Sequence, residues 1–166
     1  MGLFVFLALA LLPLVAIPAG ATPPSKTGDR RCDAQTMAIK GIESHGYHLR
    51  CDPGVKGISN TGLSVLGWVD AKHKTVWLWP DKIGKMTSSA KVFTKISVHE
   101  WGHLEQDSRH RSIAYWRSVR HLSPAVPDAR VREDYAETWS YCKAKQTGIG
   151  YSFNGGRPTT AHCRAL

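Results

Sequence analysis

Short apolar runs in the middle of the chain have the length of β-strands. Two apolar runs occupy residues 63–69 and 75–80, and a short, mostly polar segment separates them. Runs of this length joined by such a connection are typical of an antiparallel hairpin. Alternation along the second run places its side chains on opposite faces of the strand, Val76 and Leu78 against Trp77 and Trp79.

Residues 88–106 follow a helical period instead. The segment begins with serines, which favour helix starts, and contains no helix breaker before Gly102. A second long helix is predicted over 128–148, with a cap at Asp128 and an end at Gly148. In the first of these helices, intervals of four, three and four positions place four residues on one face: Val92, Ile96, His99 and His103.

The remaining segments are shorter, and no internal repeat, low-complexity segment or interior linker separates them. Short strands combined with separate helices, in a chain of 166 residues, predict a single domain of the α+β class. In chain order the pattern predicts a helix over 31–44, a strand over 46–52, a loop over 53–62, a partly helical stretch over 108–124 and a loop-like tail over 149–166.

The N-terminus is apolar from Leu3 to Ile17 and continues into the small-residue sequence AGA. This pattern predicts a cleaved signal peptide over 1–21, with the cut after Ala21, and a single secreted domain over 22–166. The alternative is a retained membrane anchor. The apolar run is shorter than the ~20 residues of a spanning helix and contains Pro13, so no membrane span is expected in the mature chain.

The chain is strongly basic, because 22 Lys and Arg residues outnumber 13 Asp and Glu residues and give a formal net charge of +9. Such a charge favours contact with anionic surfaces or substrates. The basic residues are scattered, and no long basic run is interleaved with aromatic residues. No nucleic-acid site is therefore expected, and a solvated cationic surface explains the composition.

Four cysteines follow the predicted signal peptide, and an even number in an exported chain predicts two disulfides. Three pairings are open. Nearest neighbours are preferred, because each of these bonds closes a short local loop: Cys32–Cys51 and Cys142–Cys163. A cysteine-based metal site is disfavoured, since no CxxC pair occurs.

The sequence HEWGH at 99–103 provides the strongest candidate chemistry. Residues four apart on a helix share a face, so His99 and His103 can direct their imidazoles at one Zn2+ ion. Glu100 is rotated by about 100° from His99 and can accept a proton from a water molecule on that ion. Gly102 keeps the helix narrow where another element approaches. The alternative is a surface helix with two solvated histidines.

A catalytic zinc requires a third protein ligand, and the helix predicted over 128–148 offers carboxylates. Glu133 and Glu137 lie one turn apart, which favours Glu133 as the ligand and Glu137 as a partner that orients a ligand histidine. Asp134 is the alternative for that supporting role. The metzincin arrangement is excluded, because Gln106 and Arg109 occupy the positions where it has Gly and a ligand.

The two motifs, HEWGH and EDYAE about thirty residues later, resemble the gluzincin branch of the zincin metallopeptidases, with lethal-factor-like members the nearest. The resemblance covers about 67–145. It implies a small twisted β-sheet, an active-site helix and a C-terminal glutamate helix. It also implies that the strand over 75–80 is the sheet edge that pairs with an extended substrate. The site it implies consists of the zinc ligands His99, His103 and Glu133, the catalytic base Glu100 and the supporting Glu137.

These observations predict a secreted zinc-dependent metallopeptidase that acts on a peptide, a protein or a cell-wall peptide. The alternative is a secreted zinc-stabilised or cationic binding module without turnover. Gluzincins commonly contribute a Tyr or His that stabilises the oxyanion, and no motif marks that residue in this chain. The candidates are Tyr115, His110, His121 and Tyr141.

Overall fold

The structure is a computed structural model that describes residues 29–51, 66–86, 90–144 and 155–166. The predicted signal peptide, the loop over 53–62 and the helix end at Gly148 lie outside these ranges. The helices are α1 (Arg30–Asp33), α2 (Thr36–Glu43), α3 (Pro80–Met86), α4 (Ala90–Ser108), α5 (Ile113–Val119), α6 (Asp128–Ala144) and α7 (Thr160–Ala165). The strands are β1 (His48–Cys51), β2 (Gly67–Asp70) and β3 (Thr75–Leu78).

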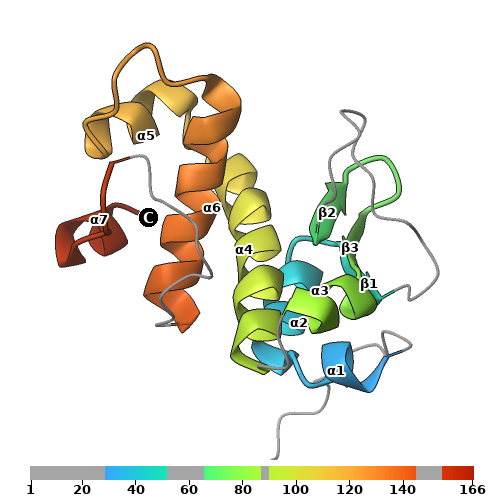
Figure 1. Ribbon diagram of the computed structural model, residues 1–166. Helices are drawn as coiled ribbons and strands as arrows, with labels where there is room; N and C mark the ends of the chain where they lie inside the picture. The colour runs from blue at the N-terminus through green and yellow to red at the C-terminus, as the bar shows by residue number, and fades with distance from the viewer. Residues whose placement is uncertain (1–28, 52–65, 87–89, 145–154) are drawn as a thin grey trace, which may run out of the picture.

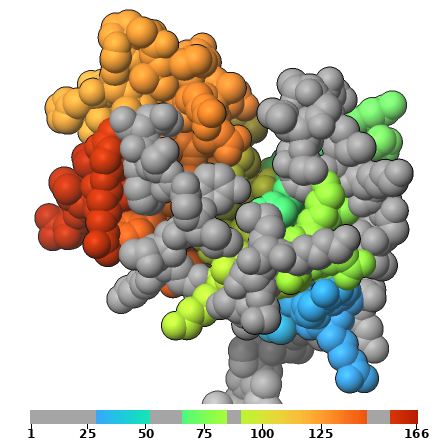
Figure 2. Space-filling view, viewed as in Figure 1, coloured from blue at the N-terminus to red at the C-terminus, as the bar shows by residue number. Residues whose placement is uncertain are grey.

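Helices α4 and α6 pack side by side through the centre of the molecule (Figure 1). The sheet and helices α1–α3 lie on one side of α4, whereas α5 and α7 flank α6. In the space-filling view (Figure 2), the N-terminal helices and sheet, coloured blue to green, occupy one side of the molecule. The C-terminal helices, coloured orange and red, occupy the other. This arrangement confirms the predicted α+β class.

The described sheet has the strand order β1-β3-β2, with β1 parallel and β2 antiparallel to β3. The predicted hairpin is confirmed, and Trp68 lies opposite Trp77 in its register. The prediction that 75–80 forms the sheet edge is wrong, because β1 pairs with the free side of β3. Strand β2 is instead an edge, and this edge borders the cavity described below.

The two faces of β3 are only partly as predicted. Val76 and Leu78 are fully buried, and Trp77 is half-buried on the opposite face. Trp79 is buried as well, although alternation had placed it with Trp77. The strand ends at Leu78 and α3 begins at Pro80, so Trp79 belongs to the turn between them and no longer follows the strand period.

The helix predicted over 31–44 is two helices, α1 and α2. The Asp29 side chain caps α1 by accepting from the Arg31 N–H. After one turn the backbone tightens, and the Gln35 N–H donates to the Cys32 carbonyl. This tighter turn ends α1 before α2 begins at Thr36.

The tail is not entirely a loop, because 160–165 form α7. The Thr159 side chain accepts from the His162 N–H, and His162 Nδ1 accepts from the Thr159 N–H. This reciprocal capping is difficult to recognise from sequence, because the usual third residue of such a box is Glu or Gln. The stretch over 108–124 is partly helical, as predicted, with α5 ending at Val119.

Both disulfides have the preferred pairing. Cys32 is bonded to Cys51, joining α1 to β1, and Cys142 is bonded to Cys163, joining α6 to α7. Disulfides of this kind are typical of proteins exported to an oxidising compartment. None of the helices in the described part of the chain is long and apolar enough to span a membrane.

Close contact between α4 and α6 depends on Gly102. A Cβ atom at this position would lie 2.9 Å from the Ala136 Cα and 3.0 Å from the Trp139 Cβ. Ser140 reinforces the contact, since its hydroxyl donates to the buried Lys95 carbonyl over 3.0 Å. The predicted narrowing of the histidine helix at Gly102 is therefore where the glutamate helix packs.

Candidate metal centre

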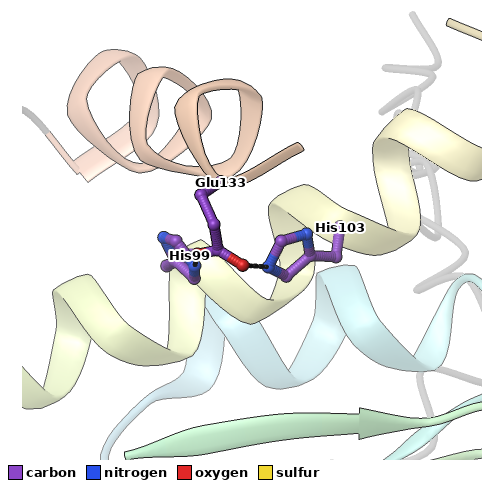
Figure 3. Close-up of side chains that lie close together, drawn as sticks. All are labelled: His99, His103 and Glu133. Atoms are coloured by element: carbon purple, nitrogen blue, oxygen red, sulfur yellow. Dashed lines mark ion pairs between the residues drawn. The ribbon is translucent and has the colours of Figure 1, made fainter. Parts of the chain in front are cut away.

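Helices α4 and α6 bring three potential metal ligands together (Figure 3). His99 and His103 lie one turn apart on α4, and Glu133 extends from α6 so that its carboxylate lies between the two imidazoles. Glu133 Oε2 is 3.2 Å from His99 Nε2, and Glu133 Oε1 is 3.6 Å from His103 Nε2. The predicted trio is thus assembled by the packing of the two central helices.

These distances fit a single metal ion. Each residue offers one ligand atom, and the three atoms lie within 4.8 Å of one another. Two ligand atoms held ~2.05 Å from a tetrahedral zinc are about 3.3 Å apart, close to the 3.2 Å and 3.6 Å that separate Glu133 from the two histidines. The donor set of two imidazoles and one carboxylate is also the set that catalytic zinc sites use.

The group is open on one side. His99 is 9% exposed, whereas the Glu133 side chain is 50% exposed. A cavity of about 470 Å³ adjoins the group and is bordered by strand β2 and by helices α4 and α6. An ion held here would therefore keep a face directed at the cavity, which distinguishes a catalytic site from a closed structural one.

Glu100 is buried beside the trio and lines the same cavity. Its carboxylate packs against Gly67 of β2, where an added Cβ would lie 2.5 Å from Oε1. Burial raises the pKa of Glu100 to about 7; the charge on His99 opposes this shift, and Glu133 and Glu137 reinforce it. A carboxyl group with this pKa can exchange a proton near neutral pH.

The two histidines differ in the metal-free site. Burial opposes a charge on His99, but contacts with Glu133 and Glu137 raise its pKa to about 10. Burial and the nearby charge on His99 lower the pKa of His103 to about 4. The metal-free group therefore retains a proton on His99, and a metal ion must displace that proton to bind.

Glu137 occupies the supporting position predicted for it. Its Oε1 atom lies 3.1 Å from His99 Nδ1, on the side of the ring away from Glu133. Its Oε2 atom lies 2.7 Å from the Nζ atom of Lys95. Burial opposes ionisation of Glu137, but His99 and then Lys95 lower its pKa. Sequence reasoning missed Lys95, although its place four residues before His99 was a usable signal.

Asp134 is engaged elsewhere. Its carboxylate accepts from Arg120 Nε over 2.7 Å and from Trp116 Nε1 over 3.1 Å, and it is fully buried in this contact. Asp134 is therefore directed at α5. The alternative prediction, that Asp134 orients a ligand histidine, is wrong. Adjacent helix positions are about 100° apart, so Glu133 and Asp134 face different neighbours.

None of the four oxyanion candidates is among the described residues that line the cavity. The Tyr115 hydroxyl donates to the Ala165 carbonyl, and the Tyr141 hydroxyl accepts from Arg157 Nε. His110 and His121 are exposed and take up left-handed backbone conformations. The exposed cation that does line the cavity is Arg132, a residue that sequence reasoning did not single out.

Comparison of the chain with protein-family models, curated proteins and solved structures finds no match. The likeness to gluzincins therefore rests on the two sequence motifs and on the His–His–Glu group in a helical α+β fold.

Proposed function

We propose that this protein is a secreted zinc-dependent metallopeptidase that hydrolyses peptide bonds. One observation carries the proposal: an open-sided group of three metal ligands lies beside a buried carboxyl group that is not part of the trio. A structural metal site needs no such base and has no open side. Glu100 supplies the base, since it lines the same cavity and is not one of the three ligands.

His99, His103 and Glu133 would hold the ion. A bound zinc ion supplies a Lewis acid for the substrate carbonyl and lowers the pKa of water to about 7. Glu100 accepts a proton from the attacking water at a carboxylate oxygen and later donates it to the departing amine nitrogen. Glu137 holds the His99 ring in place throughout.

Strand β2 supports a peptide as the substrate. It is an edge of the described sheet and borders the cavity beside Glu100. An extended peptide can pair with the free backbone groups of such an edge, in the role that the sequence had assigned to 75–80. The net charge of +9 favours an anionic substrate, such as an acidic peptide or a cell-wall peptide.

The decisive experiment compares the oxidised, zinc-loaded protein with its Glu100→Gln variant on a complex peptide library. Glu100→Gln removes the base but none of the three ligands, so zinc content should stay unchanged while cleavage falls by about 10²–10⁴-fold. Glu43→Gln, on α2 and outside the cavity lining, is the matched control and should cleave like the native protein. Chelation should abolish cleavage by the native protein and by Glu43→Gln.

The same experiment addresses the alternative of a binding module without turnover. This alternative has one observation in its favour, because none of the Tyr and His candidates for oxyanion stabilisation reaches the described part of the cavity. It predicts full zinc content in the native protein and no cleavage that depends on Glu100. That result would contradict a peptidase while leaving the metal centre in place.

A further inference from the structure

Lys95 is a buried cation beside the metal centre. It is 2% exposed, whereas lysine is almost never fully buried unless it is paired. It lies on α4 one turn before His99, and its side chain borders the same cavity. Its Nζ atom forms an ion pair with Glu137 Oε2 at 2.7 Å.

The ion pair leads directly to a metal ligand. Glu137 contacts Lys95 through Oε2 and His99 Nδ1 through Oε1. Since each oxygen lies within ion-pair distance of a nitrogen, rotation of the carboxylate would lengthen one contact or the other. Lys95 therefore fixes the group that fixes the imidazole of His99.

The backbone of Lys95 is held by the same helix as its side chain. The Ser140 hydroxyl donates to the Lys95 carbonyl over 3.0 Å, in a fully buried contact. Ser140 lies three residues after Glu137, so both contacts come from one face of α6. Two contacts with α6, one from the backbone and one from the side chain of Lys95, thus hold Lys95 in position relative to Glu137.

Charge balance gives a second reason for a cation at this position. Apart from Asp107, which pairs with Arg132, the acidic residues of the described cavity lining are Glu100, Glu133 and Glu137, with three negative charges when they are ionised. A Zn2+ ion offsets two of them, and Lys95 offsets the third. Removing one partner of a buried pair leaves an uncompensated charge, which is strongly unfavourable.

From these contacts we infer that Lys95 is a positioning residue of the metal centre. It holds Glu137 in the orientation in which Glu137 aligns His99 for the ion, and it acts through Glu137 without touching the substrate. The inference rests on the proposed function only in requiring that the His99, His103 and Glu133 group binds a metal.

The test measures zinc affinity of the full oxidised chain by competition with a chromophoric chelator. Lys95→Met retains the length of the side chain and removes the charge, and it should weaken zinc binding by about 10–100-fold. Lys91→Met is the matched control, because Lys91 is exposed one turn earlier on the same helix. It should bind zinc like the native chain. The visible spectrum of the Co2+-loaded protein should change for Lys95→Met and not for Lys91→Met.

A double-mutant cycle separates positioning from a general effect on folding. Glu137→Gln alone should also weaken zinc binding, and adding Lys95→Met to it should cause no more than a threefold further loss. The double variant leaves no unpaired buried charge, so it keeps the test available if Lys95→Met alone fails to fold. Independent, multiplying losses would overturn the inference.

The outcomes for the two proposals differ. Zinc binding by the native chain together with native affinity in Lys95→Met would overturn the positioning role alone. Failure of the native chain to bind zinc would overturn both the metal centre and the role of Lys95.

Discussion

Glu133 and Asp134 are neighbours on α6, yet they belong to two very different acidic clusters. Asp134 is sealed, and both it and its partner Arg120 have side chains that are 0% exposed. Arg120 also contacts His162 Nδ1 at 2.6 Å and donates to the Gly156 carbonyl, so this cluster joins α5, α6 and the C-terminal segment. Glu133 faces a cavity with its side chain half exposed.

The two clusters differ in where their positive charge comes from. The chain itself supplies a guanidinium to Asp134, and both of these side chains are enclosed. At Glu133 the nearest groups are two imidazoles: His99 holds a proton that a metal ion can displace, and His103 is predominantly neutral because its pKa is about 4. The first cluster therefore contributes to stability, and the second is suited to bind a cation from solution.

The largest expected effect comes from opening the sealed cluster. Asp134→Asn leaves the Arg120 guanidinium buried without its counter-charge and should lower the free energy of unfolding by about 3–5 kcal/mol. Urea denaturation in excess chelator measures this loss without any contribution from a metal. A loss below about 1 kcal/mol would contradict a stabilising role for this cluster.

Glu133→Gln should have the opposite effect: a large loss of zinc affinity and a small loss of stability. It removes a metal ligand, so zinc affinity should fall by more than the ~100-fold typical of supporting residues. Because the side chain is half exposed, the metal-free protein should lose less than about 1 kcal/mol of unfolding free energy. Competition with a chelator and urea denaturation report the two quantities separately. Unchanged zinc affinity would remove Glu133 from the metal centre.

Gly102→Ala should affect the metal centre and the packing of α4 against α6 at once. The added methyl would press on Ala136 and Trp139, so α4 and α6 must separate. Overpacking of this kind typically costs about 1–3 kcal/mol. Thermal unfolding of the chelated protein should show that loss, and zinc binding should weaken because the ligands come from both helices. Native affinity together with native stability would mean that the helices adjust without moving the ligands.

The smallest effect on stability is expected from a change at Glu105, on the other side of α4. Like Asp134, Glu105 is paired with cationic side chains of the same chain. Its carboxylate contacts Arg109, His45 and Trp101. Burial opposes ionisation, but Arg109 and His45 lower the pKa of Glu105 below its ordinary value of 4.5. A lowered carboxyl pKa contributes stability above the unfolded pKa, and this contribution is lost as the pH falls through the folded value.

The unfolding free energy of the native protein should therefore decline more steeply below pH 4.5 than that of Glu105→Gln. The difference should be about 1 kcal/mol, because Arg109 is partly exposed and solvent screens the pair. Denaturation at several pH values in chelator measures it. Parallel curves for the two proteins would show that the pair contributes no stability dependent on pH.

Features set by local geometry could be read from the sequence. The spacing of His99 and His103 is a property of any helix, and each disulfide closes a short stretch of chain. Glu133 could be placed because its helix is long and recognisable. These residues needed little knowledge of how distant segments meet.

Features that depend on distant segments could not be read in this way. The central position of β3 results from its pairing with β1, which is separated from it in sequence by more than twenty residues. The packing of Glu100 against Gly67 and the pairing of Lys95 with Glu137 arise only when α4 meets β2 and α6. The contact of Asp134 with Arg120, at the end of α5, was needed to recognise that Asp134, unlike Glu133, lies away from the metal centre.

The placement of the disulfides also determines how the chain behaves when it is cut. Cys51 and Cys142 are the inner ends of two separate loops, and no disulfide crosses the long interval between them. A single break after α3 would leave two fragments without a covalent link. One fragment would retain all the metal ligands on α4 and α6, and the other would carry β2, the wall against Glu100. The protein is therefore a natural subject for reassembly from two separately oxidised pieces.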